Sequence, residues 1–388
     1  MKVSKYPLAW LIILVVALVM PAACGPTATL PPVSAEATLL STADATPPPT
    51  ASPPATPAPP PTVAAPLSPT PAPLITIPPT AAPPTPSPTA DLADVGLPCP
   101  ASPQVKPDYV RYVLSVTPWP TPDPAAEAPP LSLSDPLPAA GRNTGYPYGS
   151  DGSGRYLLHN GLDMADENDA LAGAVAGGTI IVARDDLDEM FGWRCDWYGE
   201  LVVIRLDDLW NEQPVYALYG HIKDVQVAEG QRVERGDPVA REGAAGVAVV
   251  PHLHLEVRAG QNAFGATQNP LLWISPWSGS GVIAGRLVDL DGRAWQGVTV
   301  TLIDRSGEAD FLNTWTYLDD PDHLIRPDPS LAENFVFGPV AAGAYDVYAK
   351  IQGVEYRQPV EVRDGEISTV DIVTEPYRTP TPEASPTP

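Results

Sequence analysis

The chain has 388 residues, 52 of them proline, and a formal net charge of -24 at pH 7. Such an acidic chain disfavours nucleic acid as a partner, because a polyanion is bound by basic side chains that release its counterions. The same charge disfavours electrostatic binding to anionic lipid. The length allows two or three domains, whereas the proline content indicates that much of the chain lies outside any packed core.

The amino end is organised as an export signal. Two lysines precede an apolar run from Leu8 to Met20, which is too short for a membrane span and is followed by Pro21 and two alanines. Residues 1–23 resemble the signal peptide of bacterial lipoproteins, and the resemblance implies that Cys24 receives lipid and becomes the new amino terminus. Pro21 departs from the aliphatic residue that is usual at its place. Ordinary secretion and an uncleaved anchor are the alternatives.

The next stretch, residues 24–97, consists mostly of Pro, Thr, Ala and Ser. Its apolar and aromatic surface is too small to offset the entropy lost by ordering the chain, so we expect a disordered tether. Roughly seventy residues at ~3.1 Å each give it a reach of about 200 Å. Such a tether would let a lipid-anchored domain work into a cell wall. A simple spacer or a glycosylated stalk is the alternative.

Two further cysteines follow the tether, Cys99 and Cys195. In an exported protein an even pair favours a disulfide, which we expect to fasten the segment after the tether to the domain that follows. Closing so long a loop contributes roughly 4–5 kcal/mol in the chain-entropy model. Two unpaired thiols are the alternative.

Residues 98–278 have the pattern of an antiparallel β domain. Short runs of β-branched and aromatic residues alternate with Gly and Asp, without a long helical period between them. The clearest runs are Thr179–Ala183, Leu201–Leu206, Val215–Tyr219 and His252–Val257. We therefore predict a predominantly antiparallel sheet.

The last of these runs places two histidines on one face of a strand. Side chains alternate along a strand, so His252, His254 and Glu256 share one face and the apolar residues between them share the other. Two imidazoles at this spacing can offer a metal ligand and a neighbouring acid or base, provided that further ligands come from elsewhere. We expect Glu256 at a solvated edge; a hydrogen-bond acceptor behind the metal ligands is the alternative.

A second motif upstream completes a metal site. Four of the five histidines fall between positions 159 and 254. His159 and Asp163 are four residues apart, a spacing that brings them to one side of a helix or a strand. With His254 they would supply three protein ligands and leave one position open, which is the pattern of a catalytic zinc site. The helix-borne HExxH arrangement does not occur in the sequence.

Four motifs, in their order and spacing, resemble peptidase family M23, which is also called LytM or lysostaphin-like. They are His159-x-x-x-Asp163, Tyr219-Gly220-His221, Val233-x-x-Gly236 and Pro251-His252-Leu253-His254. The resemblance covers residues 145–275. It implies a zinc endopeptidase that cuts the peptides of bacterial peptidoglycan at the extracellular face of the cell envelope.

The same resemblance assigns roles to five residues. It implies that His159, Asp163 and His254 bind Zn2+. His252 is then expected to take a proton from water as a general base, and His221 to orient that water or to stabilise the tetrahedral oxyanion. The two histidines can exchange these roles.

Three features depart from the family pattern or extend it. The loop 243–250 lacks the small hydroxyl residues that are usual there, so its contacts with substrate are expected to differ. The segment Asp185–Glu200 contains two tryptophans and is expected to wall the cleft or to bind peptide. Tyr146, Tyr148 and Tyr156 stand where a family tyrosine helps to hold the oxyanion. We expect a packing role for each, with oxyanion binding as the alternative.

Residues 281–374 show a second series of short alternating runs. They resemble the carboxypeptidase regulatory-like, transthyretin-type domains in expected turns at Gly285 and Gly297 and in the approach from Pro339 to Tyr345. The resemblance implies a small β-sandwich, which we expect to serve in spacing or docking because it carries no cluster of catalytic side chains. Residues 375–388 return to Pro and Thr and are expected to be disordered.

Three functions are compatible with this sequence. The first is an active zinc endopeptidase. The second is a non-catalytic LytM-type regulator that activates another cell-wall hydrolase, and the third is a tethered adhesion module. All five metal-binding and flanking positions are present, which favours the first function, because such regulators usually lack some of them.

Overall fold

The computed structural model describes residues 95–138, 140–166, 169–307, 311–319 and 325–375. The expected signal peptide, Cys24, nearly all of the expected tether and the carboxyl-terminal tail from residue 376 lie outside the described residues. In the described ranges, no helix is long and apolar enough to cross a membrane.

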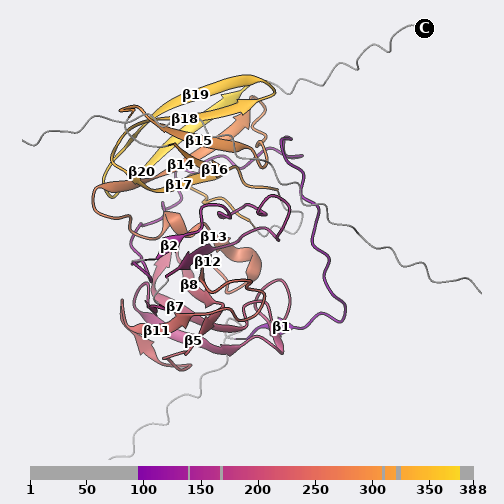
Figure 1. Cartoon of the computed structure of the whole chain (residues 1–388), viewed down its shortest axis with the longest axis vertical. Helices are drawn as coiled ribbons and strands as arrows, with labels where there is room; N and C mark the ends of the chain where they lie inside the picture. The colour runs from indigo at the N-terminus through magenta and orange to yellow at the C-terminus, as the bar shows by residue number, and fades with distance from the viewer. Residues whose placement is uncertain (1–94, 139, 167–168, 308–310, 320–324, 376–388) are drawn as a thin grey trace, which may run out of the picture. The chain divides into compact units, whose positions relative to one another are not determined.

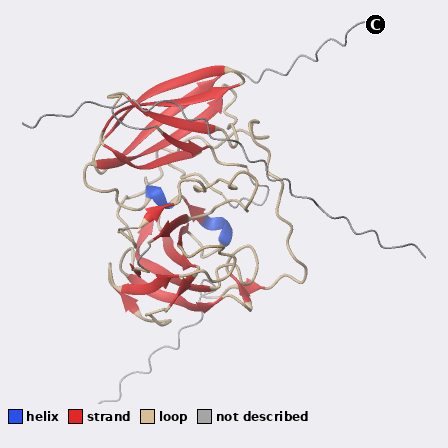
Figure 2. Cartoon of the chain, viewed as in Figure 1, coloured by secondary structure: helices blue, strands red, loops and turns tan. Residues whose placement is uncertain are grey.

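Almost all regular structure in these ranges is β-strand, as Figure 2 shows, and the expected mainly-β fold is confirmed. The strands before residue 279 are β1 (Leu97–Pro98), β2 (Gly141–Arg142), β3 (Leu162–Ala165), β4 (Leu171–Gly173), β5 (Gly178–Asp185), β6 (Glu189–Met190), β7 (Glu200–Trp210), β8 (Gln213–Gly220), β9 (Ile222–Lys223), β10 (Arg232–Val233), β11 (Pro238–Glu242), β12 (Leu253–Ala259) and β13 (Thr267–Gln268). The later strands are β14 (Ser280–Asp289), β15 (Thr299–Asp304), β16 (Leu312–Trp315), β17 (Phe335–Ala341), β18 (Gly343–Ile351), β19 (Val354–Val362) and β20 (Ile367–Thr374). Two 3₁₀-helices, η2 (Phe264–Ala266) and η3 (Pro270–Leu272), lie between β12 and β14.

Strand β12 positions the site. It lies inside an antiparallel sheet with the order β10-β5-β7-β8-β12-β3-β2, and β13 also pairs with β12 (Figure 1). In this register His254 of β12 lies opposite Asp163 of β3 and opposite Gly220 of β8, the residue before His221. The ladder therefore brings three of the sequence motifs to one place.

The alternation along β12 accounts for this register. Leu253, Leu255 and Val257 are fully buried in the main core. A slip of one residue would turn these side chains to the opposite face and the histidines into the core. The small sheet β4-β11-β9 contributes further buried residues, such as Ala172 and Val239, to the same core. Core packing thus fixes which face of β12 carries the imidazoles.

The later strands form two sheets around a second core. The sheets have the orders β17-β14-β20 and β16-β15-β18-β19, and their shared core includes Trp295, Phe335 and Ile372. The expected turn at Gly285 is wrong, because this residue lies within β14 beneath the ring of Phe335, which leaves no room for a Cβ atom. Gly297 lies in a bend between β14 and β15 with a φ of +59°, a conformation that suits glycine.

The sheet β17-β14-β20 also packs against the first core. Val282, Ala284 and Val336 belong to the same buried cluster as Leu133 and Trp273, whereas the intervening residue of β14, Ile283, belongs to the second core. Alternate side chains of β14 therefore face two different cores. This explains why Val282, Ile283 and Ala284 are apolar in succession and do not alternate with polar residues.

A buried polar cluster lies beside this contact. The rings of Tyr148 and Tyr317 meet edge to face with centroids 5.3 Å apart. The Tyr317 hydroxyl donates to Oε1 of Glu333 over 3.1 Å and accepts from Nδ2 of Asn269 over 2.9 Å. Burial, together with the nearby carboxylate of Asp328, raises the pKa of Glu333 to about 8. Glu333 is therefore mostly protonated at neutral pH.

This protonation makes stability depend on pH. Glutamate in an unfolded chain ionises near pH ~4.3, so from about pH 4.5 to 8 the folded protein binds more protons than the unfolded chain and loses stability as the pH rises. At ~1.4 kcal/mol per pKa unit, the loss is on the order of 4–5 kcal/mol. We expect Glu333→Gln to remove this pH-dependent loss of stability. Thermal unfolding measured at about pH 5 and about pH 8 should then show a smaller fall in Tm for the variant than for the wild type.

The matched control for this measurement is Glu366→Gln, because the Glu366 side chain is 58% exposed. Its Tm should fall between the two pH values as that of the wild type does. Parallel curves for Glu333→Gln and the wild type would contradict the assignment of the pH dependence to Glu333.

Candidate metal centre and cleft

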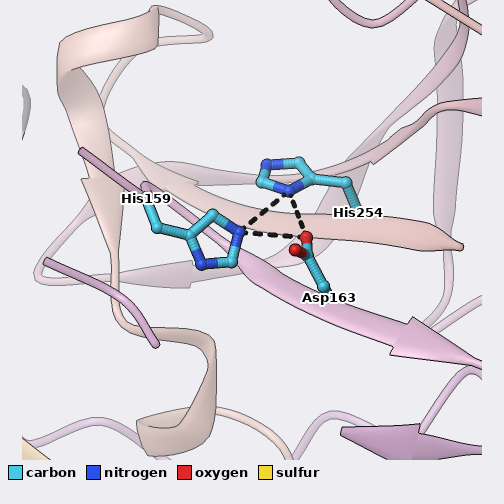
Figure 3. Close-up of side chains that lie close together, drawn as sticks. All are labelled: His159, Asp163 and His254. Carbon is cyan, nitrogen blue, oxygen red and sulfur yellow. Dashed lines mark hydrogen bonds and ion pairs between the residues drawn. The ribbon is translucent and has the colours of Figure 1, made fainter. Parts of the chain in front are cut away.

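Three side chains from β3, from the residues before it and from β12 converge on one point. Nε2 of His159 and Nδ1 of His254 lie 3.0 Å and 2.9 Å from Oδ1 of Asp163, and 3.2 Å from each other (Figure 3). All three residues are buried. The three side chains that the sequence predicts as metal ligands are thus brought together.

These donor atoms fit a bound cation. A proton can bridge only two of the three atoms, whereas a single cation can be shared by all of them. Two imidazoles and one carboxylate form a ligand set that suits zinc. Burial raises the pKa of Asp163, but the imidazoles of His159 and His254 outweigh that effect and hold the pKa well below its usual range. The carboxylate is therefore charged and can balance part of the charge of a dication.

Glu256 stands directly behind this cluster. Its Oε1 accepts from Nε2 of His254 over 3.2 Å and from Nδ2 of Asn160 over 2.8 Å, and its Oε2 accepts from Nε of Arg258 over 2.6 Å. Burial raises the pKa of Glu256, but the charge of Arg258 and the hydrogen bond from His254 lower it to about 2. This anchoring fixes the orientation of the His254 ring, with Nε2 toward Glu256 and Nδ1 toward Asp163.

The expectation that Glu256 lies at a solvated edge is therefore wrong. Glu256 is 0% exposed, and the alternative interpretation, an acceptor behind a metal ligand, describes its contacts. The alternation of side chains along β12 correctly predicted the face of the strand on which Glu256 lies. That face is covered by Tyr198, whose hydroxyl donates to the same carboxylate.

The two flanking histidines have a common geometry. Nδ1 of His221 donates to the carbonyl of Ala245 over 2.9 Å, and Nδ1 of His252 donates to that of Val250 over 2.8 Å. A carbonyl oxygen can only accept, so each ring keeps its proton on Nδ1 and offers the Nε2 lone pair. Nε2 of His252 lies 3.6 Å from Oδ1 of Asp163, and the two rings are 4.9 Å apart.

His221 is held in a strained and buried position. Its backbone φ of +61° is unusual for a residue with a side chain, and its amide donates to the carbonyl of Tyr198 over 3.0 Å. Burial, with smaller contributions from His254 and His252, lowers the pKa of His221 to about 3. The ring is therefore neutral at neutral pH.

The three tyrosines ahead of His159 have different environments. Tyr146 stacks on His159 at a centroid distance of 4.2 Å, and its hydroxyl donates to the carbonyl of Leu157 over 2.6 Å. Tyr156 is exposed and lies beside Tyr146 in the cleft. Tyr148 is buried and faces Tyr317, away from the cluster. Packing, as expected, describes Tyr146 and Tyr148.

A cavity of about 730 Å³ opens onto the cluster. Residues 185–200, here the tryptophan segment, line it with Trp193 and Trp197, as the sequence predicts. The loop before the histidine pair lines it with apolar side chains such as Val249. The carboxylate of Asp186 holds the tryptophan segment in shape, because it accepts the backbone amides of residues 197, 198 and 199 over 2.9–3.1 Å.

A further piece of chain joins two borders of the cleft. Residues 99–106, here the linking segment, begin at Cys99, whose Sγ lies 2.05 Å from that of Cys195 in the tryptophan segment. At its other end Nζ of Lys106 donates to the carbonyl of Gly154 over 3.0 Å, in the loop that leads to His159. Gln104 and Lys106 line the cavity.

Sequence reasoning missed several residues around the cluster. They are Asn160 and Arg258, which bind Glu256, Tyr198, which covers it, and Asp186. Arg258 had a signal in the sequence, because it continues the two-residue period that begins at His252. The others depend on contacts between distant segments and have no such signal.

The three side chains could hold a metal ion, and they line an open cleft. The model of peptidase family M23 matches residues 157–266, which contain all five histidine and aspartate positions described above. This chain therefore contains a domain of peptidase family M23.

Known proteins are similar to this chain over only part of its length. The lipoprotein NlpD/LppB homolog of Pseudomonas aeruginosa is 33% identical over 121 residues, which make up 31% of this chain and 34% of that protein. The peptidoglycan DD-endopeptidase ShyB of Vibrio cholerae is 31% identical over 105 residues, which make up 27% of this chain and 21% of that protein. The match thus spans about a third or less of either relative. The solved catalytic domain of lysostaphin from Staphylococcus simulans aligns at 23% identity with 35% of this chain and 92% of its own, with a TM-score of 0.28.

Removing the charge of Glu256 tests its part in the site. We expect Glu256→Gln to weaken zinc binding about 10–100-fold, because His254 loses the carboxylate that fixes its ring. We also expect a lower Tm, because the buried Arg258 loses its carboxylate, a change that costs about 3–5 kcal/mol. Chelator competition at a temperature well below the Tm of the variant measures the zinc affinity of the folded protein.

Glu355→Gln is the control for this test, because the Glu355 side chain is 61% exposed. It should bind zinc as the wild type does. If folded Glu256→Gln also binds zinc with wild-type affinity, the carboxylate only packs and does not support the ligand.

Proposed function

We propose that this protein is a zinc-dependent endopeptidase that hydrolyses peptide bonds of bacterial peptidoglycan. The observation that carries the proposal is the pair of Nε2 lone pairs, on His221 and His252, beside a cluster of three metal-ligand atoms in an open cleft. The M23 match supports a peptidase activity. The relative named a peptidoglycan DD-endopeptidase supports the choice of substrate.

The three atoms that would hold zinc are Nε2 of His159, Oδ1 of Asp163 and Nδ1 of His254. When bound, zinc supplies a Lewis acid that polarises a carbonyl group and lowers the pKa of water. Glu256 and Arg258 would keep the ligand set in place.

His252 is the proposed general base. Its ring is anchored through Nδ1, so the free Nε2 can take a proton from water and return it to the leaving amine. Its side chain is 14% exposed, which leaves it in contact with the cleft. A base so placed contributes roughly 10²–10⁴-fold to the rate.

His221 is proposed to orient the attacking water. Its Nε2 has no proton to donate to an oxyanion, because Nδ1 carries the proton that is shared with Ala245. The low pKa of about 3 also makes His221 a weaker proton acceptor than an ordinary histidine. The sequence left the roles of base and of water-orienting group interchangeable between the two histidines. These two properties favour His252 as the base.

Two variants separate metal binding from proton transfer. We expect His159→Ala to lose both zinc and activity, and His252→Ala to keep zinc while activity falls at least about 100-fold. Metal analysis and the loss of turbidity of purified cell walls provide the two readouts. Gln358→Ala, at an exposed position of β19, is the control that should retain both.

The enzymatic function would be contradicted if the wild-type protein bound no zinc and lysed no cell walls, and if His252→Ala gave the same result. That result would favour the alternative, a non-catalytic regulator that activates another cell-wall hydrolase. Wall binding that survives both His159→Ala and chelation, in a protein whose wild type shows no lysis, would favour the adhesion module.

The proposed location is the extracellular face of the cell envelope. In this proposal residues 1–23 are removed, Cys24 is lipidated, and residues 24–97 tether the peptidase domain of residues 98–278. Residues 281–374 form a carboxypeptidase regulatory-like sandwich, and residues 375–388 a disordered tail. The relative named a lipoprotein supports the anchor. An oxidising compartment is consistent with a Cys99–Cys195 disulfide, whose Cα atoms lie 5.7 Å apart.

Peptide mapping without reduction tests the anchor and the disulfide together. For protein isolated from bacterial membranes, we expect one peptide pair joined through Cys99 and Cys195 and an amino-terminal peptide that carries lipid on Cys24. Reduction should separate the pair and leave the lipid in place. Free thiols at Cys99 and Cys195 would contradict the disulfide. An unmodified Cys24 in the mature chain would contradict the lipid anchor.

A further inference from the structure

The charge that lines the cleft is opposite to that of the chain. The chain has 46 acidic and 22 basic residues, more than two carboxylates for each cation. The side chains that line the cavity include four cations, Lys106, Arg142, Arg155 and Arg194, and a single carboxylate, that of Asp163. Because Asp163 belongs to the metal cluster, the walls of the cleft are cationic.

Two of the four cations are already engaged. Arg142 forms an ion pair with Asp135 over 2.8 Å and packs over the ring of Trp277. Lys106 donates to the carbonyl of Gly154. Their contacts hold loops in place, so neither is the first choice for binding a ligand.

Arg155 and Arg194 are the cations that are free to bind. Both are exposed, and within the described residues neither forms an ion pair with a carboxylate. The contact of Arg194 is a long one, 3.5 Å, to the carbonyl of Cys195. Each therefore presents a guanidinium group to the cleft.

The two arginines reach the cleft from segments that contact different histidines. Arg155 precedes Tyr156, whose ring lies 5.0 Å from that of Tyr146, and Tyr146 stacks on His159. Arg194 belongs to the tryptophan segment, which contacts His221 through the hydrogen bond between the Tyr198 carbonyl and the His221 amide. The cleft therefore receives one guanidinium group from the segment next to His159 and one from the segment next to His221.

We propose that the cleft selects peptides with free carboxylates on both sides of the scissile bond, bound by Arg155 and Arg194. This inference rests on the proposed peptidase function. A guanidinium group binds a carboxylate through two parallel hydrogen bonds, which fixes orientation as well as position. The two arginines are separated by apolar walls that include Trp193, Trp197 and Val249, and they form no continuous basic stripe. This arrangement suits an acidic peptide better than a phosphate polymer.

Purified cell walls with blocked carboxyl groups test this selection. Walls are amidated with a carbodiimide and ammonia and compared with untreated walls, by co-sedimentation of the protein and by the release of dye-labelled fragments. We expect binding and hydrolysis of untreated walls to exceed those of amidated walls by about tenfold or more, the size of a lost charge-assisted hydrogen bond. The net charge of -24 would repel untreated, acidic walls and so predicts stronger binding to amidated walls. Which kind of wall is preferred therefore distinguishes local binding by the arginines from repulsion by the whole chain.

Variants locate the preference. Arg155→Gln and Arg194→Gln should each weaken binding and hydrolysis of untreated walls about tenfold and leave amidated walls unaffected. The double variant should no longer distinguish the two kinds of wall, and Arg155→Lys should recover part of the preference. Arg363→Gln, whose side chain is 68% exposed in the wild type and lies outside the cleft, should keep the full preference. Circular dichroism checks that each variant is folded.

Two outcomes overturn the inference: equal binding of both walls by the wild type, or a preference that survives in the folded double variant. Hydrolysis without any preference would overturn the inference and leave the proposed function standing. Binding that prefers untreated walls through the arginines, but without hydrolysis, would support the inference and overturn the enzymatic function.

Discussion

The register of β12 between β3 and β8 is the constraint on which the rest of the structure depends. It sets His254 opposite Asp163 and beside the residue that precedes His221. The buried side chains of Leu253, Leu255 and Val257 hold this register, because a shift of one residue would exchange the two faces. The same seven-residue strand therefore builds the core and the metal cluster, and packing and chemistry share one determinant.

A buried ion pair supports that strand from behind. Glu256 and Arg258 are both fully buried, and such a pair contributes little net stability because both charges lose their hydration. Its contacts indicate a positional role. Arg258 binds the carbonyl of Phe191 and the hydroxyl of Tyr198, and Glu256 binds His254. The wall of the cleft and the candidate metal ligand His254 are thus held by one hydrogen-bonded network.

The sequence predicted the features that follow from local spacing, and it failed where distant segments decide the environment. The spacing of His159 and Asp163 and the alternation through His254 predicted the cluster. Alternation also gave the face of Glu256 but not what covers that face, since the cover is Tyr198, 58 residues earlier in the chain. Residue 285 is glycine within a strand because the ring of Phe335 leaves no room for a Cβ atom, a contact between distant segments. Arg155 and Arg194 belong to no motif, and only the folded cleft sets them apart from other arginines.

The linking segment determines where tension on the chain is felt. The chain enters the described region at β1, which pairs with β6 over only two residues, and Cys99 follows at once, with its Sγ 2.05 Å from that of Cys195. A two-residue pairing gives way under a small force, whereas the proposed Cys99–Cys195 disulfide would not. A pull from the amino-terminal side would therefore be transmitted to the tryptophan segment at Cys195. The load would thus reach a wall of the cleft, and not directly the strands β3 and β12 that carry Asp163 and His254.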